Sequence, residues 1–152
     1  MRDVWSASTP FGERDYLVYE DERLSYAETH ARVASIASWL MANGVQPGDC
    51  VAIAMRNYPE WLQAYWAAIA IGATVSGMNA WWVGPEMTHG INEARPKVLV
   101  CDAERWQRLH PYRREIPEDL LVVGVRMAEA GGEVIPWEDL IGGSTELPDV
   151  DV

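Results

Sequence analysis

The chain has 152 residues, the length of one domain and enough to bury about 70% of the surface that its unfolded form exposes. Its 49% hydrophobic and 23% charged residues are ordinary for a globular α/β protein. The net charge of −11, with 12 basic residues scattered among 23 acidic ones, argues against nucleic acid as a partner, because phosphate binding needs clustered Lys and Arg.

The N-terminal part of the chain predicts two short strands and a long helix. Residues 1–15 are mixed in character, and we expect them to be loosely ordered, as termini often are. The two strands lie within residues 16–24. Ser25 with Glu28 forms a capping box at the start of the helix, which ends near Gly44.

Strands and helices alternate from residue 50 to residue 125. The strands are apolar at successive positions, which is typical of a parallel sheet that helices cover on both faces. The order predicts a doubly wound, mainly parallel α/β sheet with right-handed crossovers. The helix at 59–71 is apolar nearly all round, so we expect it to be buried, with Ile69 enclosed on all sides. The expected strands are 50–55, 74–78, 97–101 and 120–125, and the other helices are 85–94 and 103–114.

The regular alternation of strands and helices ends after Val125. A short strand is predicted at 134–136 and a helical turn at 137–141. Residues 142–152 are rich in Gly and acidic residues and indicate a linker. The chain is therefore divided into a loosely ordered N-terminus (1–15), an α/β subdomain (16–141) and an acidic linker (142–152).

The uncharged run from Trp61 to Pro85 is long enough to raise the question of a membrane span. Glycines and polar residues break this run into a helix, a turn and a strand, so we expect no transmembrane segment. The spacing of Cys50 and Cys101 fits no metal or redox motif, and the N-terminus has no apolar signal core. These features favour a cytoplasmic protein.

Local signals follow an unusual order between Gly44 and Gly72. The turn Gly44–Asp49 leads into the apolar strand 50–55, and Asn57 and the helix start Pro59–Glu60 come next. Proline is favoured in the first turn of a helix, where its missing N–H does no harm. The helix then stops at Gly72–Ala73.

This order, with Arg23–Glu28 before it and Gly72–Ala80 at its end, resembles the opening third of the large domain of the AMP-forming adenylating enzymes. That family includes acyl-CoA synthetases, aryl-CoA ligases, luciferases and the adenylation domains of peptide synthetases. The resemblance runs from about Tyr16 to about Arg108. Asn79 is closer to the fatty-acyl and aryl-CoA ligases than to the peptide-synthetase domains, although Gly77 stands where Pro is common.

The resemblance implies the N-terminal subdomain of an ATP-dependent acyl-CoA ligase. The whole enzyme activates a fatty or aromatic carboxylic acid as an acyl-adenylate and transfers it to CoA, so ATP, Mg²⁺ and CoA are implied. The family's phosphate loop, Mg²⁺-binding acid, ribose-binding Asp and catalytic Lys are expected beyond Val152. We therefore expect no cofactor for these residues alone, and the implied partners are the remainder of the adenylating domain, the carboxylic acid and CoA.

The residues present supply no convincing catalytic or metal-binding motif. The segment Gly142–Thr145 is the nearest match to a phosphate loop, but it has no lysine and Glu146 follows it. His30, His89 and His110 are far apart and form no ligand pair. We name no catalytic, cofactor-binding or metal-ligating residue in this chain.

Trp81 and Trp82 are the candidate interface residues, together with Asn79. Neighbouring residues of an extended chain point in opposite directions, so the two rings cannot share one core. They follow the end of the strand at 74–78, where open α/β sheets place their ligand crevice. Many members of the family that the chain resembles carry a basic residue near this place, on a surface that can face the CoA nucleotide, whereas this chain has aromatic residues instead. The pair therefore indicates a CoA-side surface, an interface with the rest of the domain, or two rings in ordinary packing.

A second hypothesis belongs to another class. The chain is then a free-standing α/β binding or assembly module without catalysis. That hypothesis predicts a folded chain with a closed surface, whereas the ligase hypothesis predicts an unfinished domain with exposed apolar surface.

Overall fold

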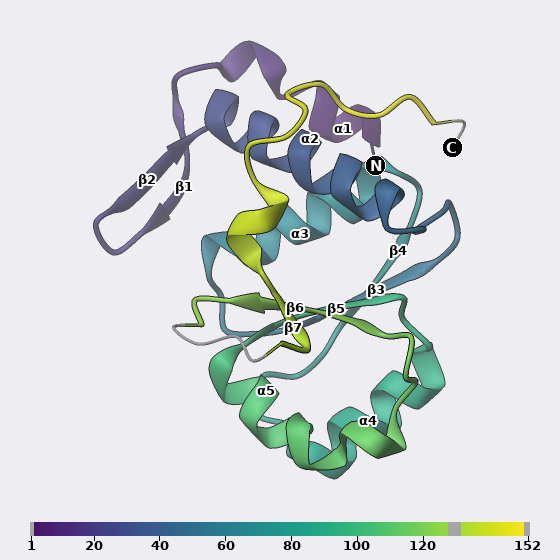
Figure 1. Cartoon of the computed structure of the whole chain (residues 1–152). Coiled ribbons are helices and arrows are strands. Elements are labelled where there is room, and N and C mark those ends of the chain that lie inside the picture. Colours follow the sequence, from purple (N-terminus) through teal and green to yellow (C-terminus); the bar gives the residue numbers. More distant parts are fainter. Residues whose placement is uncertain (1, 128–131, 151–152) are drawn as a thin grey trace.

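A five-stranded parallel sheet lies between two layers of helices in the computed structural model, which describes residues 2–127 and 132–150 (Figure 1). The strand order is β4-β3-β5-β6-β7, and every neighbouring pair is parallel. The doubly wound, mainly parallel α/β fold expected from the sequence is thus confirmed. The strands are β3 (Cys50–Ala54), β4 (Thr74–Gly77), β5 (Val98–Asp102), β6 (Leu121–Val125) and β7 (Val134–Pro136).

Successive residues of the central strands face opposite helical layers. Val51 and Ile53 join a core cluster with α2 and α3, whereas Ala52 and Ala54 join a second cluster with α4 and α5. Figure 1 shows these helix pairs above and below the sheet. The apolar runs are therefore explained by burial on both faces. The helices are α2 (Tyr26–Ala42), α3 (Pro59–Ala70), α4 (Gly84–Ala94) and α5 (Ala103–Leu109).

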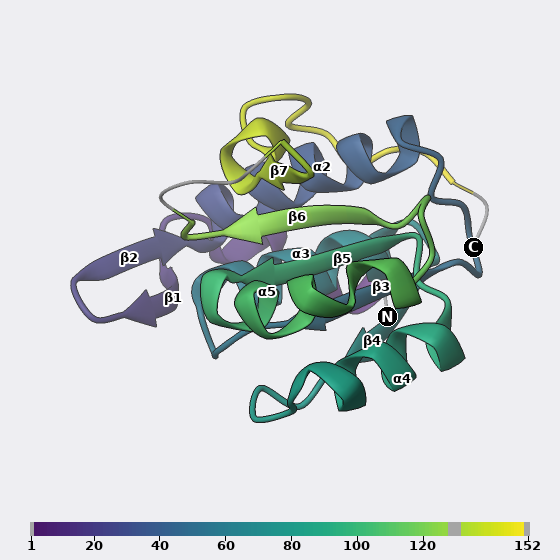
Figure 2. The same ribbon diagram turned by 60° about the horizontal axis from the view of Figure 1, so that its bottom comes forward.

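An antiparallel hairpin of β1 (Asp15–Tyr19) and β2 (Glu22–Ser25) stands apart from the main sheet. Figure 2 shows it beyond the end to which the arrow of β6 points. The hairpin leads directly into α2 through the expected capping box, in which the Ser25 amide donates to Glu28 Oε2 at 2.8 Å and the Glu28 amide donates to Ser25 Oγ at 3.1 Å.

The N-terminal residues differ from the expected loose order. Residues Arg2–Ser6 form helix α1, and Thr9–Phe11 form a 3₁₀ helix, η1. Trp5 exposes only 2% of its surface, and its ring stacks on His30 and Trp66 with centroid distances of 4.0 and 5.0 Å. The rings that bury Trp5 come from α2 and α3, so its own neighbours in sequence give no sign of them.

The helix expected at 103–114 is shorter than predicted. The α-helical part, α5, ends at Leu109, and His110–Glu115 continues as a 3₁₀ helix, η2. Pro111 explains the break, because it lacks an N–H and its ring clashes with the carbonyl four residues earlier in an α-helix. A further 3₁₀ helix, η3 (Trp137–Leu140), confirms the helical turn expected at 137–141.

The uncharged run from residue 61 to residue 85 forms most of α3, all of β4 and the loop that follows. The expectation for Ile69 is wrong: Ile69 is half-buried, whereas the buried face of α3 is rich in alanine, including Ala64, Ala67 and Ala68. These small side chains let α3 pack closely on α2, which turns the larger side chains partly outward. No helix among the described residues has both the length and the apolar character needed to cross a membrane.

Residues 142–150 form neither helix nor strand, but they contact the rest of the molecule. The Gly143 amide donates to Ser35 Oγ at 2.8 Å, and the guanidinium of Arg2 donates to the carbonyl oxygens of Pro148 and Val150 at 2.7 and 3.2 Å. Leu147 packs against the core cluster of α2 and α3. This segment therefore runs along the helical layer that contains α1 and α2.

The environment of His30 leads us to expect that the stability of the fold depends on pH. Burial beneath Trp5 lowers its pKa below the usual value, and its Nε2 lies 2.9 Å from Ser8 Oγ. As the pH falls below about 6.5, the unfolded chain takes up a proton at His30 that the folded chain does not yet bind. The free energy of unfolding should therefore decrease as the pH falls through this window, which urea unfolding at a series of pH values measures.

The variant His30→Gln is the control for this prediction. It should show a smaller loss of stability between neutral pH and about pH 5, because its side chain does not titrate there. Three carboxyl groups also have lowered pKa values, those of Glu22, Glu28 and Asp49. They titrate at still lower pH, so they do not account for a loss of stability in this pH range. An equal slope in the two proteins contradicts the prediction.

Candidate functional site

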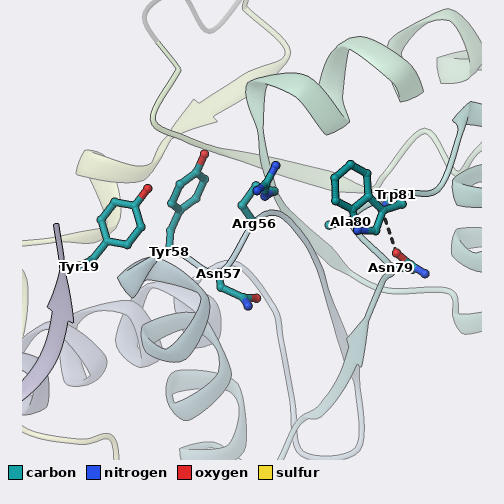
Figure 3. A pocket seen from close by; sticks show the side chains of 7 residues that line it. All are labelled: Tyr19, Arg56, Asn57, Tyr58, Asn79, Ala80 and Trp81. Atoms are coloured by element: carbon teal, nitrogen blue, oxygen red, sulfur yellow. Dashed lines mark hydrogen bonds between the residues drawn. The ribbon is translucent and has the colours of Figure 1, made fainter.

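A cleft with a volume of about 460 Å³ opens at the carboxyl ends of β3 and β4 (Figure 3). The segment 56–58 follows β3, the segment 79–81 follows β4, and the end of β1 completes the wall. Within the sheet, β4 lies next to β3 on one side and β5 lies next to β3 on the other side, so the strand order reverses direction at β3. Open α/β sheets bind ligands beside such a reversal of strand order. The lining residues are Tyr19, Arg56, Asn57, Tyr58, Asn79, Ala80 and Trp81.

The two tryptophans of the candidate pair have different environments. Trp81 is 71% exposed and lines the cleft, and the guanidinium carbon of Arg56 lies 5.4 Å from its ring centroid. Trp82 is half-buried and packs against the core cluster of α4 and α5. Its ring lies so close to Gly90 of α4 that a Cβ atom added there would be only 2.9 Å from it. Only Trp81 is therefore available to a ligand or partner in this cleft.

Asn79 shapes the loop that carries Trp81. Its Oδ1 accepts a hydrogen bond from the Trp81 amide at 2.9 Å, and its carbonyl oxygen accepts one from the Trp82 amide at 3.0 Å. Figure 3 shows this side-chain bond, with the indole of Trp81 turned toward Arg56. Asparagine is suited to this role because its side chain bonds the backbone two residues further on.

Two tyrosines form the opposite end of the cleft. Tyr19 and Tyr58 meet edge to face with a centroid distance of 5.6 Å, and the guanidinium of Arg126 lies 5.0 and 4.9 Å from their centroids. Arg126 is also ion-paired with Glu22 at 2.8 Å and with Glu60 at 3.0 Å. The hydrogen bond from Arg126 lowers the pKa of Glu22. This cluster ties the β1–β2 hairpin to the end of β6 and the start of α3.

Arg56 is the single charged side chain among the described residues that line the cleft. Within residues 2–127 and 132–150 it has no ion-pair partner, whereas Arg126 is neutralised by two glutamates. An exposed guanidinium beside an aromatic ring can hold a phosphate or carboxylate while the ring stacks on a planar group. The cleft therefore offers one cation beside one exposed aromatic ring.

The described residues offer no comparable arrangement for Mg²⁺ or for the triphosphate of ATP. No cluster of three His, Cys, Asp or Glu side chains suited to a metal ion occurs in the described part of the chain. In the Gly142–Thr145 segment the Gly143 amide is already bonded to Ser35, and Ser144 Oγ is bonded to the Glu146 amide. The Gly143 amide is therefore not free to bind a phosphate oxygen.

Asn79 and Trp81, two of the candidates from the sequence, line one end of this cleft, whereas no candidate lies at the other end. Arg56 lies two residues after the end of β3, so the rule that ligands bind at the carboxyl ends of strands could have indicated it. Tyr19 gave no such signal, because its position depends on how the hairpin packs against the sheet. Asp102 and Arg105, which lie behind the cleft, were also missed.

Comparison with known proteins supports one family over nearly the whole chain. The model of the AMP-binding enzyme family matches residues 4–139. A medium/long-chain-fatty-acid–CoA ligase of Mycobacterium tuberculosis is 27% identical over 138 residues, which is 91% of this chain and 21% of that protein. A feruloyl-CoA synthase of an Amycolatopsis species is 38% identical over 81 residues, which is 53% of this chain and 16% of that protein.

Solved structures show the same fold. The anthranilate CoA ligase AuaEII has a TM-score of 0.89 at 21% identity, over 96% of this chain and 28% of that one. A long-chain-fatty-acid–CoA ligase of Archaeoglobus fulgidus has a TM-score of 0.84 at 21% identity, over 99% of this chain and 31% of that one. This chain thus spans less than a third of each of these relatives. The match over residues 4–139 agrees with the resemblance found in the sequence, and the chain belongs to the family of AMP-binding enzymes.

Proposed function

We propose that this chain is the N-terminal α/β subdomain of an ATP-dependent, AMP-forming acyl-CoA ligase. The substrate class is a fatty or aromatic carboxylic acid, which is activated as an acyl-adenylate and transferred to CoA in the cytoplasm. The observation that carries the proposal is the family match over residues 4–139 in a chain that spans only 21% of a related fatty-acid–CoA ligase.

In this proposal residues 16–141 supply the sheet and one wall of the CoA site, and residues 142–152 lead to the remainder of the domain. Arg56 holds a phosphate of CoA, and Trp81 stacks on its adenine. The cleft supports this assignment by its place at the strand ends and by its cation beside an exposed indole. Trp81 thus takes the place of the basic residue that many family members carry near this position.

Replacement of Arg56 tests the cleft. We expect Arg56→Gln to weaken binding of adenosine 3′,5′-bisphosphate on the order of tenfold, because one charge-assisted contact is lost. Isothermal titration calorimetry measures the change. Lys97→Gln is the matched control, because it also removes one positive charge but does so at the amino end of β5, away from the cleft. There Lys97 pairs with Asp49 at 3.0 Å. Equal affinities for the two variants would contradict the assignment of Arg56.

The isolated chain should form no acyl-adenylate. The phosphate loop and the catalytic lysine that the family resemblance implies are proposed to lie outside these residues. ATP–pyrophosphate exchange with fatty and aromatic acids should therefore stay at background. Exchange above background with any of these acids would show that the chain is catalytically sufficient.

A free-standing binding or assembly module remains the alternative function. Trp81 is exposed beside Arg56, as expected if a further segment or a ligand covers it, and this favours the ligase proposal. Sequencing the gene beyond the codon for Val152 distinguishes the two. The ligase proposal predicts an open reading frame with a Ser/Thr/Gly-rich loop that ends in lysine. A stop codon at this point favours the module.

A further inference from the structure

A buried arginine lies behind the candidate cleft. Arg105 is only 1% exposed and pairs with Asp102, with 3.1 Å between Nη1 and Oδ2. Its Nε and Nη2 donate to the carbonyl oxygen of Ala80 at 2.8 and 2.6 Å. Arg108 donates to the carbonyl oxygens of Ala80 and Trp82, both at 3.1 Å. Two arginines of α5 thus hold the backbone on both sides of Trp81.

Asp102 connects this arrangement to the other wall of the cleft. Its Oδ2 accepts a hydrogen bond from the Arg56 amide at 3.0 Å, while its Oδ1 accepts one from the Arg105 amide at 3.0 Å and caps α5. A continuous chain of contacts therefore runs from Arg56 through Asp102 and Arg105 to Ala80. It links the loop after β3 to the loop after β4.

Stability alone does not require a buried ion pair at this place. Well-packed apolar residues of similar volume are often as stable as a buried pair, because removing two charges from water is costly. What an apolar pair cannot supply is directed hydrogen bonds to the carbonyl of Ala80 and the amide of Arg56. The planar guanidinium suits this task, since it presents several donors in a rigid fork.

We infer that Arg105, together with Asp102, is a positioning residue that sets the placement of Trp81 against Arg56 in the cleft. The pair holds both backbone segments from behind and does not itself contact the ligand. The identity of the ligand rests on the proposed function, whereas the placement of Trp81 does not.

Fluorine NMR of the chain labelled with 5-fluorotryptophan tests the inference. The resonance of Trp81 is assigned by its loss in Trp81→Phe. Arg56→Gln should shift this resonance, because the guanidinium lies 5.4 Å from the ring. Arg105→Lys keeps the charge but lacks the fork, so Arg56→Gln should shift the Trp81 resonance far less in that background. The difference between the two shifts is the coupling that the cycle measures.

Controls separate positioning from general loss of structure. Arg113→Lys alters an arginine that donates to the carbonyls of Pro117 and Glu118, outside the cleft, and should leave the coupling unchanged. Arg108→Lys, at a more exposed position, should reduce it in part. All variants are measured well below their unfolding midpoints, with the resonance of Trp5 as an internal reference for the fold.

The outcomes are distinct. Loss of coupling in Arg105→Lys, with the Trp5 resonance unchanged, supports the inference, and undiminished coupling overturns it. Binding of adenosine 3′,5′-bisphosphate should weaken on the order of tenfold in Arg105→Lys as well. If the unaltered chain does not bind the bisphosphate, the proposed ligand is wrong, and the NMR coupling still decides whether Arg105 positions Trp81.

Discussion

Arg105→Met should lower the free energy of unfolding by about 3–5 kcal/mol, the loss typical of breaking a buried ion pair. The variant leaves the carboxylate of Asp102, 6% exposed in its side chain, without its guanidinium partner. It also removes two donors from the carbonyl of Ala80. Urea unfolding followed by circular dichroism measures the loss.

Two further variants show which part of the effect belongs to the buried charge. Asp102→Asn combined with Arg105→Met should be more stable than Arg105→Met alone, because asparagine is neutral and can still accept the hydrogen bond that caps α5. Arg113→Met, at a partly exposed position, should cost less than about 1 kcal/mol. A cost for Arg105→Met no larger than that of Arg113→Met would mean that the pair contributes nothing.

Trp5→Ala is the second substitution with a large expected effect, a loss of about 3–5 kcal/mol. Trp5 is 2% exposed, and its ring contacts Tyr16, His30 and Trp66 from three different elements. Truncation therefore removes buried apolar surface and leaves a cavity that the rigid neighbours cannot fill. The loss should appear as a lower midpoint in both thermal and urea unfolding.

Val4→Ala is the matched control on the same short helix. Val4 is 60% exposed, so its truncation should change the free energy of unfolding by no more than about 0.5 kcal/mol. If Trp5→Ala and Val4→Ala prove equally mild, helix α1 contributes little to stability and the loose order expected from the sequence holds in solution.

The layered fold was predictable from the sequence because its signals are local. Successive apolar residues in β3 and β5 indicated burial on both faces, and Ser25 with Glu28 marked the start of α2. The short strand β7 and the turn after it were also predicted. Each of these signals depends on residues within a few positions of one another.

The candidate site was predictable only in part. The place of Trp81 after a strand end followed from the chain order. The argument from the alternation of an extended chain does not apply to Trp81 and Trp82, because residues 80 and 81 form a turn in which the Trp82 amide donates to the carbonyl oxygen of Asn79. The other wall did not follow. Tyr19 precedes Tyr58 by 39 positions in the sequence, and Arg126, which contacts both rings, lies a further 68 positions along the chain.

The sequence by itself determined the α/β class, the family and the starts of the main helices, since periodicity, caps and turns act over short distances. Only the tertiary structure decided that Trp5 is buried, that Ile69 is not fully buried and that Arg105 donates hydrogen bonds to the loop of Trp81. The physical reason is that burial and ion pairing depend on which distant residues the topology brings together. A buried guanidinium and an exposed one are written with the same letter.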